Sequence, residues 1–320
     1  MKLRCLISLI LLSTMAASSP SGEGIKVITT FGYLASDVSL LACDGDEVYS
    51  LIPQGVDPHD YQLNPRDVEL LKRADIIIST GHTPIEREIK EMVSKGEVKS
   101  RLIEIPNLDG IKILKNPMTG KENLHGVTLD PRNYLVFMNS TKEIMKEINP
   151  RCSKEYERNF EKVRAEVEEI LSRVGEVSGE VIGSSPVTQY YLEWSGLSVK
   201  WLLVREHGVP PTTRDLLEIE RALSEGKVSA IAAVRGDSSY QKSLELSEKY
   251  GVPIILLPSP IEDESSLDRI RIVSKEISKI GMETKDKREE RNVPFSSPLV
   301  VMFAILLSSA VLGGRKFLLH

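Results

Sequence analysis

Cysteine is scarce in this chain, and so are the short motifs that mark common metal-binding modules. Of 320 residues, three are cysteines, namely Cys5, Cys43 and Cys152, and their spacing matches no disulfide framework. Outside the cell Cys43 and Cys152 could pair, and two buried free thiols fit the sequence equally well. No Cys-x-x-Cys or His-Glu-x-x-His unit is present, so any metal ligands must be brought together by folding.

Further absences narrow the function. No Gly-x-x-x-x-Gly-Lys-Ser/Thr loop is present, so the chain is not itself a P-loop ATPase. A Gly-x-Ser-x-Gly nucleophile elbow is also missing, which argues against a hydrolase of that class. The net charge is a mild −5, and no basic stripe is interleaved with aromatic residues. We therefore do not expect nucleic acid as a partner.

Long apolar runs are confined to the two ends of the chain. Residues 1–19 resemble a secretory signal peptide, because Lys2 and Arg4 precede an apolar segment, Leu6–Leu12, and a small-residue cleavage region. A buried N-terminal helix is the alternative, but the apolar run is short for one. No cysteine stands at the cleavage point of a bacterial-type lipoprotein, and Cys5 would leave with the peptide. The sequence therefore predicts export.

The C-terminal segment 293–314 contains no charged residue. As a helix it would be about 33 Å long, enough to cross a membrane core of about 30 Å. Arg315 and Lys316 follow it, which places that end in the cytoplasm. Residues 283–292 form a charged tether before it. We expect a transmembrane anchor, with a core helix or a processed sorting or lipid-anchor signal as alternatives.

Between the ends lie roughly 260 residues, enough for two domains of ordinary size. Short β-rich runs alternate with helical patterns over residues 24–150, and the alternation resumes over 179–282, which indicates two parallel sheets. Residues 151–178 form one long amphipathic helix. Its apolar stripe consists of Tyr156, Phe160, Val163, Val167, Ile170 and Leu171. The predicted fold is α/β, with two lobes, each a mostly parallel sheet flanked by helices, joined by this spine helix.

The five histidines are placed informatively. His320 follows the predicted anchor, whereas His59, His82, His125 and His207 each fall in a predicted loop near the end of a strand or the start of a helix. In open α/β sheets ligands bind outside the carboxyl ends of the strands. A single histidine is usually a surface or structural residue. Several that converge would form a site for zinc or a similar transition metal.

Two of these histidines stand in recognisable surroundings. His59 lies in Gly-Val-Asp-Pro-His-Asp-Tyr, between a predicted strand, Glu47–Ile52, and a helix that the Asn64-Pro65 pair starts. His125 precedes Leu-Asp-Pro, in which Asp130 and Pro131 again combine a capping residue with proline at the first helical position. The first pattern predicts an imidazole on a short, stiff loop, and the second places an imidazole in a longer irregular stretch shortly before a helix.

These motifs, and the chain from about Lys26 to Ile280, resemble the zinc/manganese ABC-transporter substrate-binding proteins of the cluster 9, TroA-like type. The resemblance implies that His59 and His125 are metal ligands from the first lobe. The second lobe departs from the family pattern, because Ser185 stands where the family usually has a histidine, and Ser259 ends a segment that often carries an aspartate. The candidates that could complete the site are, in order of preference, His82, His207 and Asp237. Glu262 and Asp263, which follow Ser259 a little further along the chain, are weaker candidates.

The implied function is that of an extracytoplasmic solute-binding protein and not an enzyme. It would capture a divalent transition metal, zinc before manganese, in a cleft between the lobes, and deliver it to an ABC permease driven by a separate ATPase subunit. The soluble portion would be monomeric, and the C-terminal helix would hold it at the extracytoplasmic face of the cell membrane. Because binding needs neutral imidazole, affinity should fall as the pH drops through about 6.5. The alternatives are binding of a metal chelate or organic anion, a membrane-anchored hydrolase that uses Ser184 and Ser185, and an adhesive surface protein.

Overall fold

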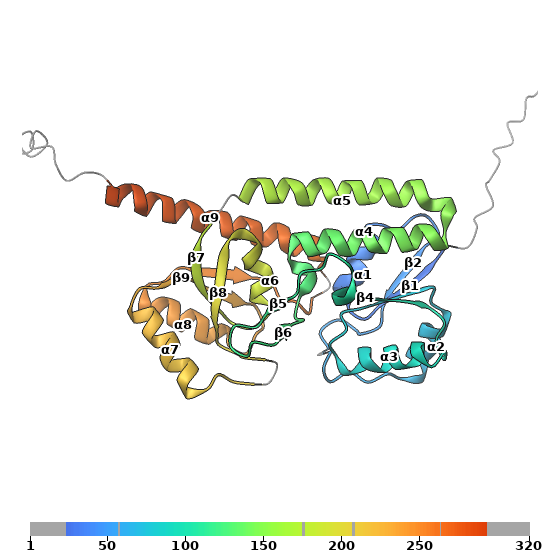
Figure 1. Ribbon diagram of the computed structural model, residues 1–320, viewed down its shortest axis with the longest axis horizontal. Helices are drawn as coiled ribbons and strands as arrows, with labels where there is room; N and C mark the ends of the chain where they lie inside the picture. Colours follow the sequence, from blue (N-terminus) through green and yellow to red (C-terminus); the bar gives the residue numbers. More distant parts are fainter. Residues whose placement is uncertain (1–23, 57, 175–176, 207–208, 263, 293–320) are drawn as a thin grey trace, which may run out of the picture. The chain divides into compact units, whose positions relative to one another are not determined.

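A computed structural model of the chain describes residues 24–292 apart from 57, 175–176, 207–208 and 263 (Figure 1). The predicted signal peptide, residues 1–19, and the predicted transmembrane segment, residues 293–314, lie outside this range. Among the helices that are described, none has both the length and the apolar character that membrane crossing requires.

The chain folds into two compact α/β units, so the predicted two-lobed fold class is confirmed. Within the described residues, the first unit comprises the chain up to Glu169 together with Ser259–Ile270, and the second comprises Ile170–Pro258 together with the chain from Arg271. The return of residues 259–270 to the first unit is not visible in the order of elements along the sequence.

The sheet of the first unit is entirely parallel, with the strand order β2-β1-β3-β4. Its strands are β1 (Lys26–Thr29), β2 (Glu47–Ser50), β3 (Ile76–Ser79) and β4 (Arg101–Glu104). The connecting helices are α1 (Gly32–Ser39), α2 (Pro65–Arg73) and α3 (Pro84–Ser94). Because β1 lies between β2 and β3, the chain moves from β1 to β2 on one side of β1 and then crosses from β2 to β3 on the other side. The sheet therefore has a topological switch point at the carboxyl ends of β1 and β3.

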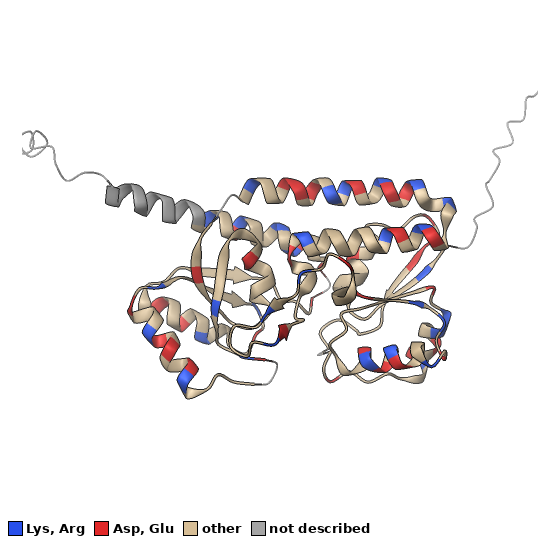
Figure 2. Ribbon diagram, viewed as in Figure 1, with Lys and Arg blue, Asp and Glu red and all other residues tan. Residues whose placement is uncertain are grey.

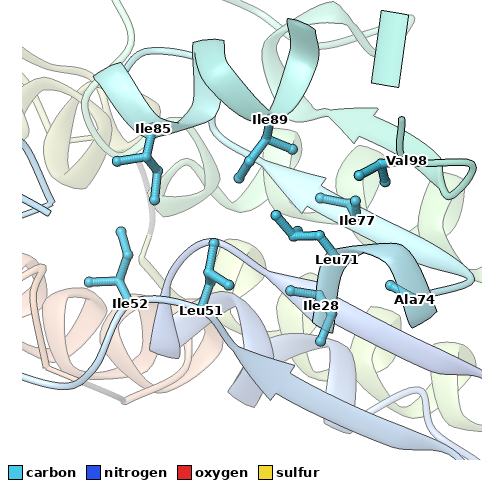
Figure 3. Close-up of a cluster of buried hydrophobic side chains, with 9 residues drawn as sticks. All are labelled: Ile28, Leu51, Ile52, Leu71, Ala74, Ile77, Ile85, Ile89 and Val98. Atoms are coloured by element: carbon cyan, nitrogen blue, oxygen red, sulfur yellow. The ribbon is translucent and has the colours of Figure 1, made fainter. Parts of the chain in front are cut away.

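Helices α2 and α3 cover one face of this sheet with aliphatic side chains (Figure 3). Ile85 and Ile89 of α3 and Leu71 of α2 meet Ile28 of β1 and Ile77 of β3 in one buried cluster. The i, i+4 spacing of Ile85 and Ile89 places both on the same side of the helix. Burial of this apolar surface stabilises the packing of α2 and α3 on the sheet.

A two-stranded antiparallel hairpin follows β4 and was not anticipated from the sequence. It consists of β5 (Leu114–Lys115) and β6 (Glu122–Asn123) and lies between the short 3₁₀ helices η1 (Ile105–Asn107) and η2 (Val127–Leu129). Strands of two residues are too short to show any alternation of apolar and polar residues, which explains why the segment appeared irregular.

Two long helices follow, and the second of them passes from the first unit into the second at Ile170. They are α4 (Pro131–Ile148) and α5 (Ser153–Val174), with the 3₁₀ helix η3 (Pro150–Cys152) between them. The predicted apolar stripe of α5 is buried at Tyr156, Phe160, Val163 and Val167. Acidic and basic residues are interspersed along the same helix (Figure 2). A disulfide joins Cys43 to Cys152, with a Cα–Cα distance of 6.2 Å, and this decides between the two states that the sequence left open.

The second unit repeats the plan of the first. Its parallel sheet has the order β10-β9-β7-β8, which again places the first strand between the second and the third. The strands are β7 (Gly179–Gly183), β8 (Leu197–Leu202), β9 (Val228–Val234) and β10 (Ile254–Leu257). The intervening helices are α6 (Thr188–Leu192), η4 (Glu193–Ser195), α7 (Thr213–Ser224) and α8 (Tyr240–Tyr250).

The last described element is α9 (Ser266–Asn292), which is longer than the sequence indicates. The predicted charged tether, residues 283–292, is its continuation and is helical. Lysine, arginine and glutamate are good helix formers, and the segment contains neither glycine nor proline to end the helix.

Candidate metal centre

Three of the predicted ligands, His59, His82 and His125, converge in the first unit. Each can offer one ring nitrogen such that these atoms all lie within 4.8 Å of one another. The ring centroids of His82 and His125 are 5.1 Å apart, and those of His59 lie 5.8 Å from His82 and 6.3 Å from His125. All three side chains are half-buried, so the cluster can still be reached from solvent.

His59 is carried by the loop between β2 and α2, and the start of α2 anchors this loop. Asn64 caps the helix by accepting hydrogen bonds from the backbone N–H groups of Arg66 and Asp67. Asp67 in turn accepts from the backbone N–H of Asn64 and from the Tyr61 hydroxyl. This capping box fixes the loop only a few residues beyond His59.

Replacing Asn64 with alanine should therefore destabilise the protein by about 1 kcal/mol, because two N–H groups at the start of α2 lose their acceptor. Thermal unfolding monitored by circular dichroism would measure the change. Asn64→Ser is the matched control, since a serine hydroxyl can still cap the helix and should keep most of the stability. Equal unfolding temperatures for Asn64→Ala and the wild type would contradict this account of the loop.

His82 follows β3 and lies directly after Gly81, whose φ of 74° favours glycine. The Phe31 ring is stacked on its imidazole with an interplanar angle of 7°. The Nδ1 atom of His82 lies 2.8 Å from the Thr80 hydroxyl and 3.8 Å from Glu86 Oε2. The imidazole is therefore held on one face by an aromatic ring and on one edge by polar groups.

Glu86 is a buried carboxylate at the switch point of the sheet, and the sequence interpretation missed it. It accepts hydrogen bonds from the backbone N–H groups of Thr80, His82 and Thr83. The hydroxyls of Thr30, Thr80 and Thr83 donate to it as well. A Thr-x-x-Glu capping box at Thr83 was visible in the sequence, but that motif does not reveal that the carboxylate also reaches the ends of β1 and β3.

Electrostatics in this pair favour a charged carboxylate and a neutral imidazole. Burial is the largest influence on His82 and lowers its pKa to about 4; Glu86 raises it, and His125 and His59 lower it further. Burial alone would raise the pKa of Glu86, but interaction with His82 and the hydrogen bonds from Thr83, Thr30 and Thr80 outweigh burial and lower it. At neutral pH His82 is therefore uncharged, the form that binds metal ions.

His125 lies between β6 and η2. Its backbone N–H donates to Asn123 Oδ1 at 3.0 Å, and Gly126 follows with a φ of 80°. Asp130 caps α4 by accepting from the backbone N–H of Arg132, as the Asp-Pro pair predicted. The histidine is thus placed by a hairpin on one side and a helix start on the other.

Among the described residues, no other predicted ligand is grouped with these three histidines. His207 and Asp263 lie outside the described residues. Glu262 belongs to the first unit, where it lines a hollow with Phe31 and Pro58, but its carboxylate is not among the grouped donor atoms. Within the described part of the chain, the three histidines are the one group of at least three His, Cys, Asp or Glu residues with this spacing.

Ser185 and Asp237 lie in the second unit at its own switch point, beyond the carboxyl ends of β7 and β9. Asp237 Oδ2 accepts hydrogen bonds from the Ser184 hydroxyl at 2.8 Å and the Ser185 hydroxyl at 2.6 Å. Burial raises the pKa of Asp237, while these two hydroxyls lower it in part. The position of Glu86 in the first unit is therefore matched by Asp237 in the second, with serine in place of threonine as the donor.

Three imidazoles at this spacing can bind a transition metal, since direct ligation places each donor nitrogen about 2.0–2.1 Å from zinc. Donor atoms on a sphere of that radius lie up to about 4 Å apart, so small side-chain rotations would bring the three nitrogens into range. Iron, copper and nickel accept imidazole ligands as well as zinc does.

The chain is similar in sequence to known metal-binding proteins. The family model for "Zinc-uptake complex component A periplasmic" (ZnuA) matches residues 27–268. The iron-binding protein YfeA of Yersinia pestis is 25% identical over 256 residues, which cover 76% of this chain and 82% of that protein. The manganese ABC transporter substrate-binding lipoprotein PsaA of Streptococcus anginosus is 24% identical over 228 residues, covering 66% of this chain and 74% of PsaA.

Solved structures share the fold. The substrate-binding protein FpvC from Pseudomonas aeruginosa, solved with Mn2+, superposes with a TM-score of 0.67 at 18% identity, covering 82% of this chain and all of FpvC. A ZnuA crystal structure gives a TM-score of 0.63 at 16% identity, covering 81% of this chain and 99% of that one. Because the family model spans most of the chain, the protein belongs to the ZnuA family of metal-binding substrate-binding proteins of ABC importers, which are binding proteins and not enzymes.

Proposed function

We propose that His59, His82 and His125 together bind a divalent transition metal as cargo, which the protein delivers to the permease of an ABC importer powered by a separate ATPase subunit. The observation that carries this proposal is the grouping of three ring nitrogens within 4.8 Å of one another. The three histidines come from loops far apart in sequence, so their convergence is a product of the fold.

Zinc is the cargo that this set of donors favours. Imidazole suits zinc, copper, iron and nickel, whereas manganese prefers carboxylate and other oxygen ligands. The cluster within the described residues contains nitrogen donors and no carboxylate. Relatives of this chain are named for iron and for manganese, so the choice of ion rests here on the chemistry of the three histidines.

The proposed location is the extracytoplasmic face of the membrane. The Cys43–Cys152 disulfide supports it, because disulfides persist in oxidising compartments and are rare in the cytosol. We infer from the sequence that residues 1–19 direct export and that residues 293–314 anchor the protein, with a soluble portion that acts as a monomer. The anchor would keep the binding protein close to its permease.

The test is a titration of the purified full chain, in mild detergent and freed of metal by a chelator, with Zn2+ and separately with Mn2+. Isothermal calorimetry should give one site per chain, with zinc bound at least about tenfold more tightly than manganese because all three donors are imidazoles. Calcium, which takes oxygen ligands, is the negative control. Tight binding of an organic anion or a metal chelate, with no binding of free ions, would favour the rival function.

A further inference from the structure

We infer that Thr80 and Glu86 fix the tautomer of His82, so that Nδ1 carries the ring proton and Nε2 presents its lone pair to the metal. The inference rests on the proposed function, and it assigns a positioning role to two residues that do not bind the metal themselves. It starts from a hydrogen-bonded chain that runs from Glu86 through the Thr80 hydroxyl to the imidazole.

The distances define this chain. Thr80 Oγ1 lies 2.9 Å from Glu86 Oε1 and 2.8 Å from Glu86 Oε2, and the same oxygen lies 2.8 Å from His82 Nδ1. The hydroxyl has a single hydrogen, so it can donate to the carboxylate or to the imidazole nitrogen but not fully to both.

The carboxylate decides where that hydrogen goes. Backbone N–H groups can only donate, and they reach both carboxylate oxygens, that of Thr80 at Oε1 and those of His82 and Thr83 at Oε2, so both oxygens act as acceptors. An ionised carboxylate cannot donate, and two oxygen acceptors at 2.8 Å without a hydrogen between them would repel each other. Thr80 therefore donates to Glu86, and its oxygen is left as an acceptor toward His82.

The imidazole must then supply the hydrogen of the second bond. Neutral histidine carries one ring proton, and placing it on Nδ1 leaves Nε2 as the nitrogen with a lone pair. Metal-bound histidines commonly donate their second ring N–H to such a partner, and loss of the partner typically weakens metal binding 10- to 100-fold. The same carboxylate also holds the backbone N–H of His82, which limits movement of the loop.

These hydrogen bonds connect the ends of two strands, β1 and β3, to one proposed metal ligand, His82. Thr30, at the end of β1, donates to Glu86 Oε1 at 2.8 Å, and Thr80 follows β3. Both threonines are buried and both donate to Glu86. Of the two, Thr80 is the one whose hydroxyl also bonds to His82 Nδ1. This difference provides a matched pair of variants.

The test compares Thr80→Val with Thr30→Val in the full chain. Each change removes one buried hydroxyl from Glu86 at nearly constant shape, and Thr80→Ser restores the hydroxyl at position 80. Thr80→Val should weaken zinc binding by about tenfold or more, the cost of losing the hydrogen-bond partner of a metal-bound histidine. Thr30→Val and Thr80→Ser keep that partner, so their zinc affinity should stay within about threefold of the wild type. Zinc affinity would be measured by calorimetry, with circular dichroism to compare stability.

A direct readout is the tautomer itself. Long-range 1H–15N spectra of metal-free protein labelled with 15N-histidine should show His82 protonated at Nδ1 in the wild type and in Thr30→Val, with a shift toward Nε2 protonation in Thr80→Val. The His82→Ala spectrum assigns the signal. Wild-type His82 protonated at Nε2, or equal effects of the two valine variants, would overturn the inference. Absence of zinc binding in the wild type would instead refute the proposed function, and the tautomer measurement would still stand.

Discussion

Replacing His82 with alanine should lower the affinity for zinc about 100- to 1,000-fold, as much as replacing His59 or His125. Structural zinc sites with four protein ligands release about 10–16 kcal/mol on binding, or roughly 2.5–4 kcal/mol per ligand. Since about 1.4 kcal/mol corresponds to a factor of ten in affinity, loss of one ligand costs two to three powers of ten. An equal loss at His82 would be informative, because the family resemblance implied only His59 and His125 as ligands.

Calorimetric titration of each single variant with zinc would measure this loss. His320→Ala is the matched control, because it makes the same chemical change at a histidine that follows the predicted membrane anchor in the sequence, and it should bind as the wild type does. A His82→Ala protein with wild-type affinity would show that His82 is a neighbour of the site and not a ligand. Unchanged affinity in His59→Ala and His125→Ala as well would remove the whole cluster from consideration.

Periodicity and turn chemistry were sufficient to predict most elements of both sheets. The Asn64-Pro65 and Asp130-Pro131 pairs start helices where expected, and the alternation of strands and helices correctly indicated two parallel sheets. These features depend on local backbone preferences, which a single sequence records. The unexpected length of α9 also has a local cause, because the charged residues at its end favour a helix.

The site was only partly predictable, because it depends on strand order. His59 follows β2 and His82 follows β3, and these two strands lie on either side of β1. The sequence identifies the strands but not their order, so it ranked His82 above His207 as a third ligand without establishing that His82 lies beside His59 and His125. His125 approaches through the β5–β6 hairpin, which carries no periodic signal. Glu86 was missed because its partners come from two strands and a loop.

Removing the Cys43–Cys152 disulfide should destabilise the first unit by about 4–5 kcal/mol, the value that chain-entropy arguments give for a closed loop of about 100 residues. The two cysteines are 109 residues apart, and all three clustered histidines lie in the segment between them. Without the bridge, the unfolded chain gains conformational freedom that the folded state must overcome. A loss of this size is comparable to the whole stability of a marginal domain.

The experiment is urea unfolding of the Cys43→Ser/Cys152→Ser double variant, followed by circular dichroism. Both tryptophans of the chain, Trp194 and Trp201, lie in the second unit, so their fluorescence reports on that unit separately. The dichroism midpoint should fall well below that of the wild type, and the fluorescence midpoint should fall less. A reductant should shift the wild type toward the variant and leave the variant unchanged. If the variant unfolds at the wild-type midpoint, the bridge contributes little to stability, and non-covalent interactions account for the stability of the first unit.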